Sequence, residues 1–178
     1  MVFRGRFARS IDPKGRLLLP NEFREGMTKA QADASSAPGS FVLTTYDGCL
    51  VAFSPEDWAE LEKKFMRIPN PSPQVRAFRR LVIGGAETHT PDSHGRILLS
   101  PDHRAYAGIE REATVLGLVD RFEIWNPAAL KASQGEVSLQ LSAQGPQIMQ
   151  KSCKQGWLQP ATSQGHAGLR SRAQHCAR

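Results

Sequence analysis

The chain has 178 residues, enough for one ordinary domain or two small ones, and 40% of them are hydrophobic. It contains no apolar run of about 18 residues, so we expect no membrane span. The N-terminal residues are basic and lack the apolar core of a signal peptide, which favours a cytoplasmic location. Three cysteines without a Cys-x-x-Cys pair argue against a disulfide framework or a zinc knuckle.

The net charge of +6 is distributed unevenly along the chain. Residues 1–133 hold 18 Lys and Arg against 16 Asp and Glu, whereas residues 134–178 hold 5 against 1. The overall charge therefore says little about nucleic-acid binding. Whether the protein binds nucleic acid depends on where the cations lie within the fold. Residues 134–178 also contain 9 of the 11 glutamines and show little apolar periodicity. We expect residues 131–178 to form a divergent, disordered tail.

The N-terminal residues predict a strand, a tight turn and a second strand. Period-two alternation over residues 2–11 indicates a strand with Arg4 and Arg6 on its polar face. In Asp12-Pro13-Lys14-Gly15 the proline presets φ, the aspartate can bond the following backbone and the glycine closes the turn. The apolar run at residues 16–19 predicts a short strand buried on both faces.

The next segment predicts a short helix, a loop and a hairpin. Residues 20–24 are expected to form one helical turn, and the Ala-, Ser- and Gly-rich residues 26–40 a mobile loop. Residues 41–45 and 49–53 then predict two strands joined by a turn at Asp47-Gly48.

Two helices are predicted after this hairpin. Ser54-Pro55 and Ser72-Pro73 each combine a capping serine with a proline suited to the first helical position. Prolines at 69 and 71 end the first helix, and Gly84-Gly85 ends the second. The second helix carries three arginines that we interpret mainly as a solvated face, with nucleic-acid contact as the less favoured alternative: Arg76, Arg79 and Arg80.

The second half of the chain repeats the first. Residues 91–100 match residues 11–20 at a shift of 80, so that Asp92, Gly95 and Arg96 correspond to the residues of the first turn. Neither unit is large enough to bury much surface alone, which predicts that the two copies pack into one pseudo-symmetric β-rich core. The expected organisation is a first repeat, a helical connection, a second repeat and the tail: residues 1–54, 55–84, 85–130 and 131–178.

The sequence offers little support for catalysis or for a cofactor. The Asp12/Arg16 and Asp92/Arg96 pairs lack a nearby nucleophile, and no Gly-rich phosphate loop follows a strand, so we do not expect an enzyme. A metal site is possible on composition alone, from His89, Asp92, His94 and His103. The first repeat has none of these histidines, so the duplication itself cannot exist to bind metal.

The charge pattern distinguishes the two copies. Residues 1–24 carry six basic and two acidic side chains, whereas residues 84–104 carry two and three. An arginine fork suits the O6 and N7 atoms of guanine, and an aspartate across the turn can hold that fork in place. The same aspartate could equally brace the turn for stability alone. The residues leave DNA binding and a purely structural pair as open alternatives.

Several motifs in residues 1 to about 130 occur together: Phe3-Arg4-Gly5, Asp12-Pro13-Lys14-Gly15-Arg16-Leu17, Pro20, Phe23-Arg24, Asp47-Gly48-Cys49-Leu50, Trp58, Asp92-Ser93-His94-Gly95-Arg96 and Arg121-Phe122-Glu123-Ile124-Trp125. In these motifs the chain resembles the MraZ family of bacterial transcriptional regulators. The resemblance implies an α+β, β-rich fold, namely an AbrB-like swapped-hairpin β-barrel made of two internal repeats with appended helices.

The resemblance also implies a function and a set of residues. It implies a homo-oligomeric ring, associated with the nucleoid, that binds repeated elements in double-stranded DNA upstream of the division and cell-wall operon, with no cofactor and no small-molecule substrate. Arg16 carries over as the main DNA-binding residue with Asp12 as its partner, and Arg96 and Asp92 carry over from the second copy. Charge and position add three further DNA-binding candidates: Lys14, Arg4 and Arg6. The alternative is a protein-interaction module that uses the same barrel without specific DNA binding.

Overall fold

The computed structural model describes residues 2–30 and 37–135. The elements in chain order are β1 (Phe3–Ser10), β2 (Arg16–Leu18), α1 (Asn21–Ala30), β3 (Phe41–Tyr46), β4 (Cys49–Phe53), α2 (Pro55–Met66), α3 (Pro73–Val82), β5 (Glu87–His89), β6 (Arg96–Leu98), α4 (Pro101–Ala107), β7 (Glu112–Val119) and β8 (Phe122–Trp125). Residues 127–135 form a further helix. Across these two ranges, no helix has the length and apolar character needed to cross a membrane.

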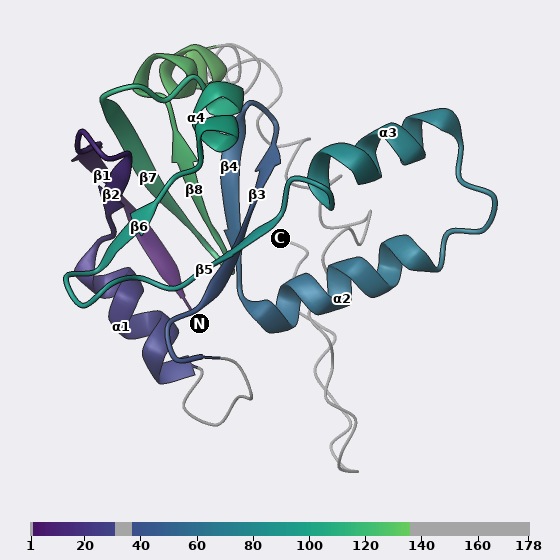
Figure 1. Ribbon diagram of the computed structural model, residues 1–178, viewed down its shortest axis with the longest axis horizontal. Coiled ribbons are helices and arrows are strands. Elements are labelled where there is room, and N and C mark those ends of the chain that lie inside the picture. The colour runs from purple at the N-terminus through teal and green to yellow at the C-terminus, as the bar shows by residue number, and fades with distance from the viewer. Residues whose placement is uncertain (1, 31–36, 136–178) are drawn as a thin grey trace, which may run out of the picture. The chain divides into compact units, whose positions relative to one another are not determined.

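The main sheet has six strands in the order β1-β7-β8-β4-β3-β5 (Figure 1). At the shift of 80 residues β1 matches β5. After the loop the shift falls to 72, at which Pro55 matches Pro127, and there β3 matches β7 and β4 matches β8. The order is therefore symmetric about the β8–β4 pair, where Val51 lies opposite Glu123. Each half of the sheet combines the first strand of one repeat with the hairpin of the other. The repeats thus exchange strands, and the fold is α+β and β-rich as expected.

The remaining strands, β2 and β6, form a separate antiparallel pair that we call the β2–β6 ribbon. The expected barrel is not closed, because in the described chain the only β-bridge between this ribbon and the end of β1 joins Ile11 and Leu17. On the other side, β5 has only three residues. Pro91 follows it closely and has no N–H with which to extend a ladder.

Phenylalanines from both repeats meet in the core. The ring of Phe122 lies 5.2 Å from those of Phe3 and Phe41 and 5.5 Å from that of Phe23. All four are nearly inaccessible to solvent, as are Leu17 and Leu19 of the first repeat and Ile97 and Leu99 of the second. Burial of these rings supplies apolar area that neither repeat could bury alone.

The structure corrects the expected course of the chain after the first turn. Leu18 is exposed between buried Leu17 and Leu19, so this strand is buried on one face and not on both. The helix expected to end at residue 24 continues to Ala30, because Phe23 and Met27 are spaced four residues apart and bury together against the core. The segment expected to be a mobile loop therefore begins as a helix, and its residues 31–36 lie outside the described chain.

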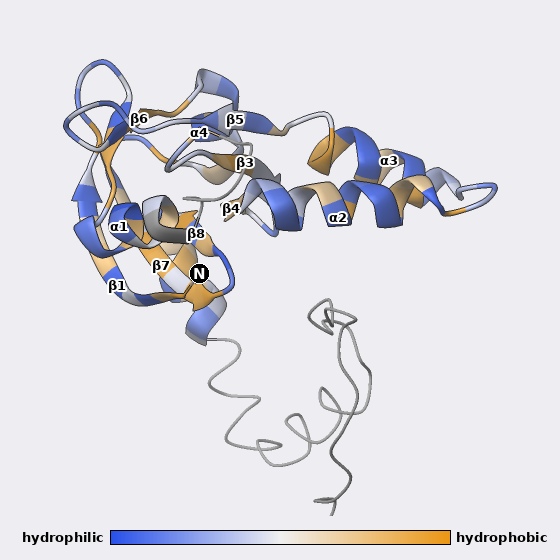
Figure 2. Cartoon of the chain, turned by 90° about the horizontal axis from the view of Figure 1, so that it is seen from below, coloured by the Kyte–Doolittle hydropathy of each residue, from blue (hydrophilic) through white to orange (hydrophobic). Residues whose placement is uncertain are grey.

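The helices α2 and α3 form an arm that lies beside the sheet (Figures 1 and 2). The caps expected for both helices are present, since Ser54 accepts from the N–H of Asp57 and Ser72 from that of Val75. Phe65 and Phe78 stack between the helices with ring centres 5.2 Å apart. Figure 2 shows hydrophilic residues along much of the arm, whereas β7 and β8 are strongly hydrophobic.

The last element of the described chain is a helix that follows β8. Asn126 caps the helix at residues 127–135, since its side-chain oxygen accepts from the N–H groups of Ala128 and Ala129. Residues 131–135 continue this helix, although the tail was expected to begin at 131. The rest of the expected tail, residues 136–178, lies outside the described residues.

Candidate nucleic-acid interface

Asp12 organises the first turn through several hydrogen bonds. Its Oδ1 atom accepts from the backbone N–H groups of Lys14 and Arg16, both at 2.9 Å, and its Oδ2 atom accepts from Nε of Arg16 at 2.6 Å. Its carbonyl oxygen accepts from the N–H of Gly15 at 2.8 Å. Gly15 has a φ of +82°, a conformation that glycine adopts without steric cost. The aspartate thus shapes the turn and orients the guanidinium group.

The electrostatics of the turn favour the charged carboxylate. The backbone N–H of Arg16 is the largest cause that lowers the pKa of Asp12, and the guanidinium group of Arg16 adds to it. Of the guanidinium nitrogens, only Nε bonds to Asp12. The two Nη groups of Arg16 have no partner among the described residues and can donate to an acceptor outside the chain.

The second turn repeats this geometry with one difference. Asp92 accepts from the backbone N–H groups of Arg96 and His94 at 2.9 Å. The backbone N–H of Arg96, then its guanidinium group and the N–H of His94, lower the pKa of Asp92 to about 2. Nε of Arg96 lies 2.9 Å from Oδ2 of Asp92, and Nη2 lies 2.8 Å from the same oxygen. Nη2 also lies 3.4 Å from Nδ1 of His94. The second guanidinium group therefore has one neighbour in its own turn, His94, that the first turn does not provide.

The ribbon brings the two turns together. Leu17 lies opposite Ile97, and the pairing is reciprocal: the N–H of Leu19 donates to Gly95, and that of Leu99 donates to Gly15, both at 3.0 Å. Each turn is thus hydrogen-bonded to the end of the other repeat's strand. This pairing between residues some 80 positions apart could not be read from either copy alone.

The outer face of the ribbon carries two arginines and two leucines. Arg16 lies opposite Leu98, and Leu18 lies opposite Arg96. Directly opposed residues share a face, and residues two apart on one strand do as well, so all four side chains project from the same side. Leu18 and Leu98 are 44% and 57% exposed. The result is a small surface on which cationic and apolar groups alternate.

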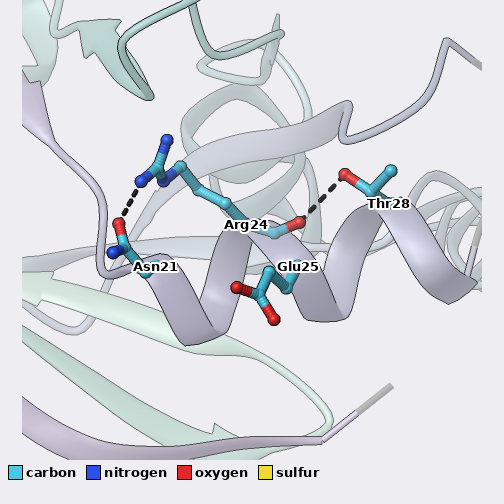
Figure 3. A pocket seen from close by; sticks show the side chains of 4 residues that line it. All are labelled: Asn21, Arg24, Glu25 and Thr28. Atoms are coloured by element: carbon cyan, nitrogen blue, oxygen red, sulfur yellow. Dashed lines mark hydrogen bonds between the residues drawn. The ribbon is translucent and has the colours of Figure 1, made fainter.

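Two further arginines cover the turns from the opposite repeats. The guanidinium carbon of Arg104 lies 3.5 Å from the position that a Cβ atom would take at Gly15. The side chain of Arg24 occupies the position that a Cβ atom would take at Gly95. Arg24 bonds to Asn21, with which it lines a surface pocket of about 410 Å³ at α1 (Figure 3). The sequence shows that Arg24 and Arg104 correspond, but their contact with the other repeat's turn depends on the ribbon.

The cations of β1 lie apart from the turns. Arg4 and Arg6 are exposed on the face of β1 opposite Phe3, as expected. At about 3.3 Å per residue, Arg4 lies roughly 20 Å from the end of the strand that enters the turn. Arg6 donates to Gln134 of the C-terminal helix at 2.7 Å. Lys14 is exposed at the turn itself, so of these three candidates only Lys14 accompanies Arg16.

Arg9 braces the first turn from β1. Its Nε atom donates to the carbonyl oxygen of Leu18 at 3.1 Å, and its guanidinium carbon lies 5.5 Å from the centre of the Phe7 ring. In the arm, Arg76 donates to the carbonyl oxygen of Pro71. Arg76 and Arg80 are exposed, as expected for a solvated face, whereas Arg79 is partly buried and donates to the carbonyl oxygen of Phe65.

Comparison with known proteins places this surface in a family context. The family model described as "MraZ protein, putative antitoxin-like" matches residues 2–81 and again residues 82–147. A protein named transcriptional regulator MraZ from Oleidesulfovibrio alaskensis is 50% identical over 136 residues, 76% of this chain and 88% of the relative. Similar proteins of the same name from Nitratidesulfovibrio vulgaris and Thermomicrobium roseum are 48% and 42% identical, over 74% and 84% of this chain and 85% and 96% of the relatives.

Proposed function

Because the chain belongs to the MraZ family of transcriptional regulators, we propose that it is a regulator that binds specific DNA sequences through the β2–β6 ribbon. The proposal includes repeated elements upstream of the division and cell-wall operon as the target. It includes a homo-oligomeric ring that sets several ribbons against successive elements, and association with the nucleoid. A regulator of this kind needs no catalytic group and no cofactor.

The outer face of the ribbon is the observation that supports the proposal best. The major groove of B-DNA admits a two-stranded antiparallel ribbon, and base edges there are read by a few rigid donors. Arg16 and Arg96 occupy diagonal positions of this ribbon, and such neighbours lie roughly 7–8 Å apart, with their Cβ atoms somewhat closer. The free Nη groups of Arg16 suit bidentate contact with guanine, and the exposed Leu18 and Leu98 suit contact with thymine methyl groups.

Phosphate contacts are assigned to the other cations. Lys14 is exposed beside Arg16 and would meet the backbone that borders the groove. Arg4 and Arg6 lie farther along β1, where they would add attraction for any DNA sequence. The first repeat thus supplies most of the binding energy in this proposal, and the second repeat completes the ribbon.

A gel-shift experiment with the DNA upstream of the gene tests the proposal. Arg16→Ala should lose specific binding, by at least about 100-fold if each oligomer loses several guanine contacts worth about 1–3 kcal/mol each. Size-exclusion chromatography should show the same oligomer for wild type and variant. Unchanged affinity of the variant for the upstream repeats would refute base recognition by Arg16.

The salt dependence of binding separates phosphate neutralisation from base recognition. Arg4→Ala or Arg6→Ala should weaken binding to specific and unrelated DNA alike. Either variant should also reduce the slope of log K against log salt by roughly 1, because one phosphate is no longer neutralised. A loss of affinity confined to the specific sequence would instead assign these arginines to base readout.

The second candidate function is a protein-interaction module on the same ribbon. Exposed Leu18 and Leu98 favour it, since neighbouring apolar side chains on a surface also suit contact with a protein. A partner that still binds the Arg16→Ala variant, together with no shift of the upstream DNA by the wild type, would favour this function over the first.

A further inference from the structure

Three side chains with metal-binding atoms meet between the edge strand β5 and the helix α4. They are Glu87 and His89 of β5 and His103 of α4, and one ligand atom of each lies within 4.8 Å of the others. Two of the four residues that composition suggested as metal ligands are therefore brought together. The other two, Asp92 and His94, belong to the second turn and bond there.

The fold explains why these residues converge. Glu87 and His89 are two residues apart on β5, so their side chains share one face of this edge strand. His103 lies in the first turn of α4, where its N–H donates to the capping serine, Ser100. The ring of Phe41 stacks on His89 at 5.7 Å and fixes the position of that imidazole.

The same place in the first repeat is filled by apolar contact. At the shift of 80, Phe7 and Phe23 correspond to Glu87 and His103, and their rings pack edge to face at 5.4 Å. The fold thus does not require polar groups here. Buried imidazoles need partners, because a buried polar atom without one costs free energy.

Within the described chain, His89 and His103 each have a buried ring nitrogen without a hydrogen-bond partner. His103 is only 2% exposed, and its Nδ1 atom is buried without a hydrogen bond. Nε2 of His89 is also buried without a hydrogen bond, although it lies 3.5 Å from a carboxylate oxygen of Glu87. Nε2 of His103 lies 3.9 Å from the other oxygen of Glu87 and 2.7 Å from the carbonyl oxygen of Gly85.

We propose that Glu87, His89 and His103 bind a divalent transition-metal cation such as Zn²⁺. Two imidazole nitrogens and one carboxylate form a donor set that suits zinc and leaves a fourth position for water or for the nearby carbonyl of Gly85. Tetrahedral bonds of 2.0–2.2 Å separate neighbouring ligand atoms by about 3.4 Å. Nε2 of His89 lies 3.5 Å from Oε2 of Glu87, and Nε2 of His103 lies 3.9 Å from Oε1, so each imidazole is near this separation from one of the two carboxylate oxygens.

The cation would link parts of the second repeat that the backbone joins only loosely. Its ligands come from an edge strand of three residues and from the first turn of α4, and the proposed site has no counterpart in the first repeat. Glu87 is 43% exposed, so the cation can enter from solvent at its carboxylate. The chemistry excludes Mg²⁺ and Ca²⁺ as preferred occupants, because those cations favour all-oxygen sites.

Metal titration of the untagged full-length protein tests the site, with Co²⁺ as a spectroscopic substitute for Zn²⁺. Wild type should show the visible absorption of four-coordinate Co²⁺ without thiolate charge transfer, and Zn²⁺ should displace it. Glu87→Gln and His89→Gln should each weaken Co²⁺ binding by at least about tenfold, because each removes a ligand. Zn²⁺ should raise the melting temperature of wild type but not of these variants.

His94→Gln is the matched control, since it removes an exposed histidine of the same repeat and should leave Co²⁺ affinity unchanged. Glu87→Gln preserves the shape of a partly exposed side chain, so its effect can be measured on a folded protein even where a His103 variant fails to fold. Equal Co²⁺ affinity in wild type, Glu87→Gln and His89→Gln would overturn the proposal and assign any binding to other residues, such as His166 and His175.

Discussion

The two turns of the β2–β6 ribbon share one backbone design and differ in the groups they present. Asp12 and Asp92 accept the same three hydrogen bonds from their own turns. Arg16 and Arg96 each donate from Nε to their aspartate, whereas Nη2 of Arg96 also lies 3.4 Å from Nδ1 of His94. The duplication has therefore kept the bonds that make the turn, while the groups available to a ligand have diverged.

The charge around the two turns also differs, and the first turn is the more cationic. Lys14 of the first turn is replaced by His94 in the second, and the net charge falls from +4 over residues 1–24 to −1 over residues 84–104. A pseudo-symmetric fold thus presents an asymmetric surface. In the proposed function, the first turn contacts the anionic ligand and the second turn mainly completes the ribbon.

The largest expected difference between the turns lies in their arginines. Arg16→Ala should abolish specific DNA binding, whereas Arg96→Ala should weaken it by no more than about tenfold, the lower end of the range for one base contact. Parallel gel shifts with the same upstream DNA measure the affinity that each of the two variants loses relative to wild type. Equal losses would show that the free Nη groups of Arg16 do not distinguish the two copies.

The glycines of the turns should differ in stability. Gly15 and Gly95 have φ values of +82° and +80°, so alanine at either costs about 1–2 kcal/mol in backbone strain. At Gly95 the added methyl group would also displace the side chain of Arg24 and its bond to Asn21, whereas at Gly15 it meets Arg104 at an ordinary distance. The free energy of unfolding, measured with urea, should therefore be lower for Gly95→Ala than for Gly15→Ala. The reverse order would mean that Arg24 does not cover the second turn.

The glycine comparison also marks what the sequence can and cannot predict. Local chemistry predicted the turns, the hairpin at Asp47-Gly48 and the capping serines, because each depends on residues within a few positions. The exposure of Leu18 was missed, since it depends on a partner strand 80 residues away. The covering of the turns by Arg24 and Arg104 was missed for the same reason.

The candidate site was predicted to a similar extent. The Asp-x-x-x-Arg spacing located both ion pairs, but the shared outer face of Arg16 and Arg96 follows only from the register of the ribbon. The histidines of the second repeat were noticed, yet Glu87 was not grouped with them, because the pairing of β5 with β3 and the position of α4 bring it there. Long-range pairing is the information that a single sequence lacks.

Exchanging the residues at the tips of the turns tests whether charge explains the difference. His94→Lys adds a cation beside Arg96 and should strengthen DNA binding at low salt, whereas Lys14→His should weaken it, each by a few-fold as expected for one phosphate contact. The double variant should recover close to wild-type affinity if only total charge matters. Failure of that recovery, measured by fluorescence anisotropy, would assign Lys14 a contact that position 94 cannot make.

The smallest expected effect is a response of the turns to acid. Hydrogen bonds from the turn backbone lower the pKa of Asp92 from 3.8 to about 2 and also lower that of Asp12. A carboxylate with a lowered pKa stabilises the folded state above its unfolded pKa, and this contribution is lost as the pH falls toward the folded value. The contribution of Asp92 to the second turn should therefore be lost between about pH 4 and pH 2, and that of Asp12 to the first turn should be lost as the pH falls below about 4. Amide chemical shifts of Arg16 and Arg96 report this loss, and Asp92→Asn should remove the acid response of the second turn alone. A response of Arg96 that persisted in Asp92→Asn would mean that a group other than Asp92 controls the second turn.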